Sequence, residues 1–165
     1  MASTEFFKVM GSQERHDELI KLSANNYVLF VGYGEENGQG YVWRKDYDHK
    51  PEEVELRADI NSLINRITDG NILTGFVWNG KPVYLSQENQ MNFKAAHDLA
   101  VQTDGAILPV KFKLGEDAEG RPVYHTFTKV EVMQDFVLKT FAHINKCTTE
   151  GWAEKDSIDY SNFNI

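Results

Sequence analysis

A five-residue motif occurs twice in this chain, as Gly80-Lys81-Pro82-Val83-Tyr84 and as Gly120-Arg121-Pro122-Val123-Tyr124. In both copies a turn-forming glycine and a proline precede a Val-Tyr pair of the kind that favours strands. Each copy follows an alternating apolar segment and precedes a capped amphipathic helical pattern. The motif therefore predicts two strand–turn–strand–helix units over about residues 71–147. Chance reuse of favourable turn chemistry is the alternative interpretation.

The hydrophobic pattern predicts the elements of both units. Asn79-Gly80 is a strong signal for a tight hairpin, and Ser86 and Thr128 are placed to cap the two helices. A proline just after each turn removes a backbone donor, so we expect the return strands at sheet edges. The predicted strands are 72–78, 83–85, 108–114 and 123–127, and the predicted helices are 86–102 and about 128–147. The inner helix faces are expected to carry Phe93, Ala96, Ala100, Met133, Phe136, Val137, Thr140, Phe141 and Ile144.

Before the repeat, the pattern predicts a short strand, a helix, a hairpin with a long acidic tip at residues 35–40, and a second helix. The second helix is expected to begin at Pro51, where a missing N–H costs nothing. Gly70 is placed to end that helix in the left-handed conformation. The predicted ranges are 3–10 for the strand, 12–25 for the first helix, 27–31 and 41–43 for the hairpin strands, and 51–69 for the second helix.

Together these elements predict an α+β fold in which the two repeat units pack with an N-terminal helix, hairpin and helix. We expect an N-terminal helix and hairpin region over 1–50 and a duplicated hairpin–helix domain, preceded by a helix, over 51–147. Residues 148–165 are expected to form a C-terminal tail, because they are polar with scattered aromatic side chains. Only a short turn or helix is predicted there, around Trp152.

The charge balance excludes some partners. The chain has 25 acidic and 17 basic residues, a net charge of −8, and no run of Lys and Arg longer than two residues. Proteins that bind duplex DNA usually present a basic face, so nucleic acid and anionic membranes are not expected partners. No apolar run approaches the roughly 20 residues that span a bilayer. The single cysteine, Cys147, is expected to be a buried structural residue.

No motif supplies a catalytic or metal-binding set. The five histidines have no spacing typical of a metal site with Cys147, and no nucleophile elbow or catalytic triad can be assigned. The segment 32–38 has the glycines of a dinucleotide-binding loop, but the third is one residue late and two glutamates occupy the phosphate position. We therefore expect no enzyme activity, no cofactor and no metal. Trp43, Trp78 and Trp152 leave a sugar-stacking platform as an alternative.

From about Glu55 to Asp159, the order of motifs resembles a small, poorly characterised family of bacteriophage tail-associated proteins. The resemblance is carried by ELRADINSLINRI, by GFVWNGKPVYLSQENQMNF, and by the later segments FVLKTFAHINKC and EKDSID. It covers roughly two thirds of the chain and leaves the first fifty residues outside. Members of such families are typically encoded among tail, tail-fibre and baseplate genes. The resemblance therefore implies a component of the virion, or an accessory of its assembly in the bacterial host cytoplasm, and it transfers no catalytic or binding residues.

The favoured hypothesis is a structural or interaction protein of a phage tail or capsid surface, which binds other phage structural proteins. An assembly chaperone absent from the mature particle is one alternative, and a carbohydrate-binding or carbohydrate-active module of a host-recognition apparatus is another. We also expect a homo-oligomer, because edge strands and surplus aromatic side chains are typical of interfaces. The candidate interface residues are Tyr41, Trp43, Trp78 and Tyr84.

Overall fold

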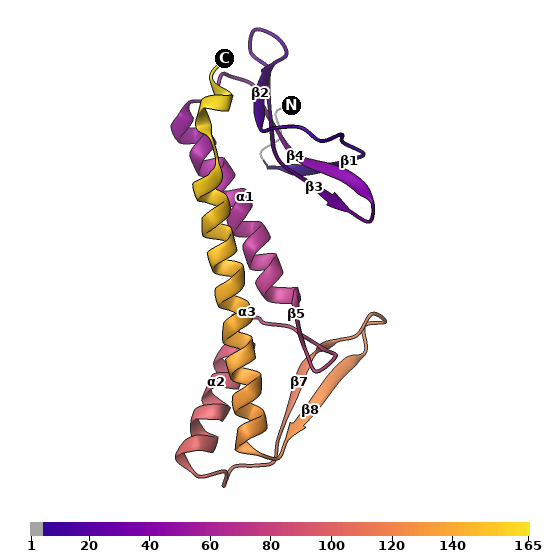
Figure 1. Cartoon of the computed structure of the whole chain (residues 1–165), viewed down its shortest axis with the longest axis vertical. Coiled ribbons are helices and arrows are strands. Elements are labelled where there is room, and N and C mark those ends of the chain that lie inside the picture. The colour runs from indigo at the N-terminus through magenta and orange to yellow at the C-terminus, as the bar shows by residue number, and fades with distance from the viewer. Residues whose placement is uncertain (1–4) are drawn as a thin grey trace. The chain divides into compact units, whose positions relative to one another are not determined.

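The computed structural model describes residues 5–165 and confirms the α+β class. The chain forms two compact units: one ends at Ile64 and also includes Glu154–Ile165, and the other is Asn65–Ala153. Both unit boundaries fall inside long helices. Of the two predicted boundaries, the one after residue 50 precedes the first of these helices, and the one after residue 147 lies within the second. Figure 1 labels most of the elements, which are β1 (Phe7–Met10), β2 (Glu18–Lys21), β3 (Tyr27–Glu36), β4 (Gln39–Tyr47), α1 (Glu53–Thr74), β5 (Phe76–Trp78), β6 (Lys81–Val83), α2 (Gln87–Gln102), β7 (Val110–Glu116), β8 (Pro122–Phe127), α3 (Val130–Ser157) and the 3₁₀ helix η1 (Tyr160–Phe163).

The first unit contains a four-stranded antiparallel sheet in the order β1-β4-β3-β2. The β3–β4 hairpin closes through Asn37 and Gly38, whose φ values of 52° and 74° are those of a tight two-residue turn. The predicted long acidic tip is therefore wrong, because the strands continue to Glu36 and Gln39. A bulge between Val31 and Gly34 accommodates the glycine-rich stretch within the strand.

The helix predicted over residues 12–25 is also wrong, because Glu18–Lys21 form the edge strand β2. Leu19 pairs with Leu29 of β3, and both side chains are buried. The apolar stripe of this segment is too short to support a helix, whereas pairing with β3 satisfies its backbone and buries Leu19. The strand predicted over 3–10 is confirmed for Phe7–Met10, and Ser3 and Thr4 lie outside the described residues.

Contacts between β4 and α1 connect this sheet to a helix of the same unit. The Tyr47 hydroxyl donates a hydrogen bond to Asp59 Oδ2 at 2.7 Å, and Lys45 Nζ lies 2.6 Å from the same oxygen. Burial, reinforced by this hydrogen bond to a carboxylate, raises the pKa of Tyr47. The apolar side chains buried in this unit include Leu19, Leu29, Val31, Leu56, Ile60 and Leu63.

The second unit contains the two repeat copies, and both form a hairpin followed by a helix. The β5–β6 hairpin turns through Asn79 and Gly80, both at positive φ, as the sequence predicts. Ser86 caps α2 by accepting a hydrogen bond from the Asn89 N–H, which confirms the predicted cap. Each return strand lies in a two-stranded sheet, which confirms that both are edge strands. Figure 1 shows α2 and the first part of α3 with the two hairpins, and these elements share one core that includes Trp78, Phe93, Leu114, Phe127, Met133 and Phe136.

Three expectations about the helices are corrected. Helix α1 continues through Gly70 to Thr74, so Ile72 is helical and β5 begins only at Phe76. Gly70 is permitted to end a helix but is not required to, and it has no positive φ here. Phe141 is 67% exposed and lies outside the core that it was expected to join.

The polar segment predicted as a tail mostly belongs to α3, which continues to Ser157. Gly151 is buried where this helix meets Thr68 of α1, and a Cβ atom at Gly151 would overlap Thr68 Oγ1. Glycine therefore allows the two helices to approach closely at this point. The sequence pattern does not reveal this contact, because it depends on a partner far away in the chain.

Two glycine-to-alanine substitutions test this packing. We expect Gly151→Ala to lower the free energy of unfolding by about 1–3 kcal/mol, because the new methyl group has no room beside Thr68. Gly70→Ala is the matched control in the same unit: its Cβ meets open space, so we expect a gain of about 0.5–1 kcal/mol from helix propensity. Denaturant titration of both variants measures the difference, and a stabilised Gly151→Ala protein would contradict the close helix contact.

Candidate functional site

The repeated motif places its glycines and its tyrosines in equivalent environments. Gly80 and Gly120 both adopt positive φ, at 74° and 76°. Val83 is fully buried, and its counterpart Val123 is half-buried. Tyr84 and Tyr124 face solvent, with 46% and 49% of their surface exposed. The duplication is therefore structural, and each copy presents one tyrosine on the exposed side of its hairpin.

The exposed sides of the two hairpins form a surface that we call the outer hairpin face. Side chains alternate along a strand, so the neighbours of the buried core residues project to the opposite side. The N–H of Tyr84 donates a 2.8 Å hydrogen bond to the Leu114 carbonyl, which joins the first hairpin to β7. Exposed residues of both hairpins therefore belong to one surface. The outer hairpin face consists of Val77, Tyr84, Lys111, Lys113, Tyr124 and Thr126.

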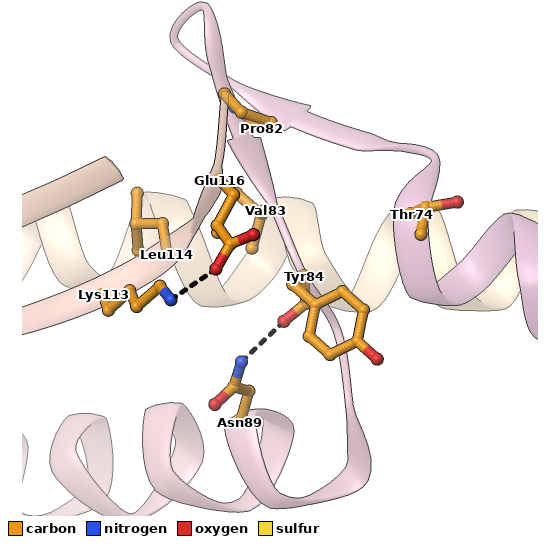
Figure 2. A pocket seen from close by; sticks show the side chains of 9 residues that line it. Thr74, Pro82, Val83, Tyr84, Asn89, Lys113, Leu114 and Glu116 are labelled. Atoms are coloured by element: carbon orange, nitrogen blue, oxygen red, sulfur yellow. Dashed lines mark hydrogen bonds and ion pairs between the residues drawn. The ribbon is translucent and has the colours of Figure 1, made fainter. Parts of the chain in front are cut away.

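A hollow of about 560 Å³ lies where the two hairpins meet (Figure 2). Its lining includes Gly115 together with Val83 and Leu114, whose side chains are buried in the core. Polar groups complete the lining, and among them Lys113 Nζ and Glu116 Oε1 form a 2.7 Å ion pair that Figure 2 marks. The other lining residues are Thr74, Pro82, Tyr84 and Asn89. The apolar rings of Pro82 and Tyr84 beside the exposed charged groups suit an amphipathic ligand segment.

Gly115 determines how closely the two hairpins approach. A Cβ atom there would lie 2.8 Å from the Pro82 carbonyl oxygen and 3.2 Å from the Tyr84 nitrogen. Both are backbone atoms, so they cannot move away by a change of side-chain rotamer. The residue also follows a bulge between Lys113 and Gly115, which places Leu114 in the core. Any larger residue at this position would separate β6 from β7.

Two lysines give the outer hairpin face its charge. Lys111 Nζ lies 4.5 Å from the centre of the Tyr124 ring, a cation–π contact. Within residues 5–165, Lys111 has no carboxylate partner. The hydrogen bond to Glu116 raises the pKa of Lys113 from its ordinary value, so Lys113 is charged at neutral pH.

Of the four predicted interface residues, the structure places Tyr84 on this face and Trp78 in the core. Trp78 is 2% exposed, so its assignment to a surface is wrong. Its indole Nε1 donates a 3.0 Å hydrogen bond to Asp135 Oδ2, and its ring packs edge-on against Phe136. On β5 the outward position belongs to Val77 instead. Because Trp78 is buried, the proposed three-tryptophan platform for sugars does not form.

The other two predicted residues, Tyr41 and Trp43, lie together on the sheet of the first unit. Both are half-buried, and they occupy alternate positions on the same face of β4. Lys8 Nζ lies 4.2 Å from the Tyr41 ring centre and 5.5 Å from that of Trp43. The same ammonium forms a 2.8 Å ion pair with Glu36. The cation covers part of both rings, which makes this pair a less open surface than the outer hairpin face.

Three residues of the outer hairpin face, Tyr124, Lys111 and Val77, were not predicted from the sequence. Tyr124 had a usable signal, because it is the counterpart of Tyr84 in the second copy of the motif. The sequence contains no comparable signal for Lys111 and Val77, since their exposure depends on which side of each hairpin the helices cover.

Within the described part of the chain, no group of three His, Cys, Asp or Glu side chains is placed to hold a metal ion. Cys147 is buried, as expected, and burial raises the pKa of its thiol.

Among residues 5–165, no helix has the length and apolar character that crossing a bilayer requires. The absence of enzyme activity stays a prediction.

Comparison of the chain with protein-family models, with curated proteins and with solved structures finds no match. The resemblance to phage tail-associated proteins therefore stays an expectation from the sequence.

The junction between the hairpins can be tested by one substitution. We expect Gly115→Ala to lower the free energy of unfolding by about 1–3 kcal/mol, because two backbone atoms must move to admit the methyl group. The amide of Tyr84 should also lose protection, because its hydrogen bond to Leu114 crosses the junction. Hydrogen exchange followed by NMR measures both effects. Unchanged protection at Tyr84 would show that the hairpins do not depend on this close approach.

A second test concerns His125, whose ring packs against Trp78 and Phe127 and whose Nδ1 lies 2.8 Å from Lys81 Nζ. Burial and, to a lesser degree, the nearby ammonium lower the pKa of His125 below its ordinary value of 6.5. Its contribution to stability is therefore complete above pH 6.5 and is lost as the pH falls through the folded-state pKa.

NMR titration of the histidine ring protons measures this shift directly. His49 provides the internal comparison, because hydrogen bonds to Asp48 and Glu55 raise its pKa. We expect His125 to titrate below 6.5 and His49 above it. Lys81→Met should move the pKa of His125 upward without restoring it fully, since burial is the larger cause. Titration of His125 above His49 would contradict the described environment.

Proposed function

We propose that this protein is a structural or interaction protein of a bacteriophage particle, located on the tail or on the capsid surface. Its role is to bind other structural proteins of the particle, and it acts without catalysing a reaction. The outer hairpin face is the observation that carries the binding part of this proposal. The sequence resemblance over residues 55–159 supports the assignment to a phage.

The outer hairpin face has the composition of a binding surface. Tyr84 and Tyr124 offer large contact areas, and few rotatable bonds limit the entropy lost on binding. Val77 adds exposed apolar area on the neighbouring strand. The hollow between the hairpins offers a place for one partner side chain, with Pro82 and Tyr84 in its lining. A partner docked there would cover the exposed side of a sheet whose other side already contacts the core.

Self-association is part of the proposal, because many particle components are built by rotational symmetry. The edge strand β8 carries Pro122, which limits but does not prevent pairing with another chain, whereas β7 already approaches the edge of β6. Sedimentation of the purified full chain at micromolar concentration measures this. If the protein sediments strictly as a monomer, self-association is removed from the proposal and only binding to other particle components stays in it.

Mass spectrometry of purified particles tests the main proposal. In particles from a host that expresses the gene, we expect the protein at a constant number of copies. We expect Tyr84→Ala combined with Tyr124→Ala to reduce its incorporation, because the two rings supply the contact area of the outer hairpin face. Met91→Ala is the matched control, since Met91 is exposed on α2 rather than on that face.

The possible outcomes separate the alternatives. If the protein is abundant in infected cells but absent from finished particles, it is an assembly chaperone rather than a component of the virion. Equal incorporation of the double variant and of the control would remove the outer hairpin face from the proposal.

A further inference from the structure

The outer hairpin face differs in charge from the chain that carries it. The protein has a net charge of −8, yet this face presents Lys111 and Lys113 with Glu116 as the only carboxylate in the adjoining hollow. A basic face on an acidic protein attracts a negatively charged partner at close range and excludes basic ones. The charge pattern therefore indicates the class of partner.

Both lysines are available for such a partner. Lys111 contacts the Tyr124 ring and has no carboxylate partner among residues 5–165. Lys113 does have Glu116, but water reaches both ends of this ion pair. Exposed pairs are weak because water competes for both charges. A partner carboxylate can therefore share or replace Glu116 at small cost.

The spacing of the two lysines favours an extended ligand. They are two residues apart on β7, so they project from the same side of the strand about 7 Å apart. An extended peptide places its side chains i and i+2 at the same separation. The hollow follows directly along β7, where its lining includes Leu114 and Gly115. The next side chain on the same side of the peptide, at i+4, can therefore reach the hollow.

We propose that the outer hairpin face binds an extended acidic segment of a partner protein, with carboxylates at alternate positions against Lys111 and Lys113 and an apolar side chain in the hollow. This inference rests on the proposed function of the face as a binding surface. It adds the chemistry of the segment that the face takes.

The test uses the full-length protein and a capped peptide with the sequence Ser-Glu-Ser-Glu-Ser-Leu-Ser. A second peptide with the reversed sequence tests the opposite direction of the segment relative to β7. NMR titration should show saturable shifts at residues of the outer hairpin face for at least one direction. Replacing both Glu by Lys in the peptide should abolish binding, and replacing Leu by Ser should weaken it. Added salt should also weaken binding, because the contacts are between exposed charges.

Matched variants separate specific binding from general charge attraction. Lys111→Glu combined with Lys113→Glu should weaken binding about tenfold or more, because two attractive contacts become repulsive. Lys94→Glu combined with Lys146→Glu changes the net charge equally, at exposed helix lysines off this face. This control should change binding by less than about twofold. Near-ultraviolet dichroism confirms that both variants fold.

Three results would overturn the proposal: no saturable binding in either direction, equal binding of the lysine peptide, or an equal loss in the control variant. If the peptide does not bind and the Lys111/Lys113 variant loses a homo-oligomer that the unchanged protein forms, the outer hairpin face binds a second copy of this chain instead. The proposed function can survive these failures. If the tyrosine double variant is excluded from particles while the acidic peptide does not bind, the face is a binding surface for a partner of different chemistry.

Discussion

The second unit depends on the close approach of two hairpins at Gly115. Without a Cβ atom, β7 comes close enough to β6 for the Tyr84 N–H to reach the Leu114 carbonyl. That hydrogen bond joins the two repeat copies, so their apolar sides form one core rather than two. The same junction creates the hollow on the opposite side. A packing constraint and the candidate binding surface therefore have one origin.

Burial of Trp78 illustrates how this core tolerates polar groups. Its indole N–H reaches Asp135, whose carboxylate also forms a 3.0 Å ion pair with Lys139. The hydrogen bond from Trp78 and the contact with Lys139 both lower the pKa of Asp135, so its carboxylate stays charged at neutral pH. Because the donor of Trp78 is satisfied, its large ring can be buried without the cost of an unpaired polar group. Trp78 therefore packs in the core and cannot contact a partner at the surface.

Charge is distributed unevenly over the elements. The first turn of α1 carries Glu53 and Glu55, where negative charge suits the helix dipole. Three exposed lysines on helices are paired with carboxylates one helical turn away, as Lys94 is with Asp98. Lys111 lies on a strand, where no such neighbour exists, and it rests on Tyr124 instead. The strand on which Lys111 occurs thus explains why this lysine has no carboxylate partner among residues 5–165.

Local signals in the sequence were sufficient for the duplicated hairpins, the Asn79-Gly80 turn and the cap at Ser86, because each depends on residues close together in the chain. The same reasoning failed for residues 18–21, where pairing with β3 outweighs a weak helical pattern. It failed again for Gly151, whose neighbour Thr68 belongs to another helix. The candidate surface was found in part, since the motif selects Tyr84 and, by repetition, Tyr124. Which of Val77 and Trp78 faces solvent was decided only by tertiary structure, because alternation separates the two sides of a strand without identifying the side that the helices cover.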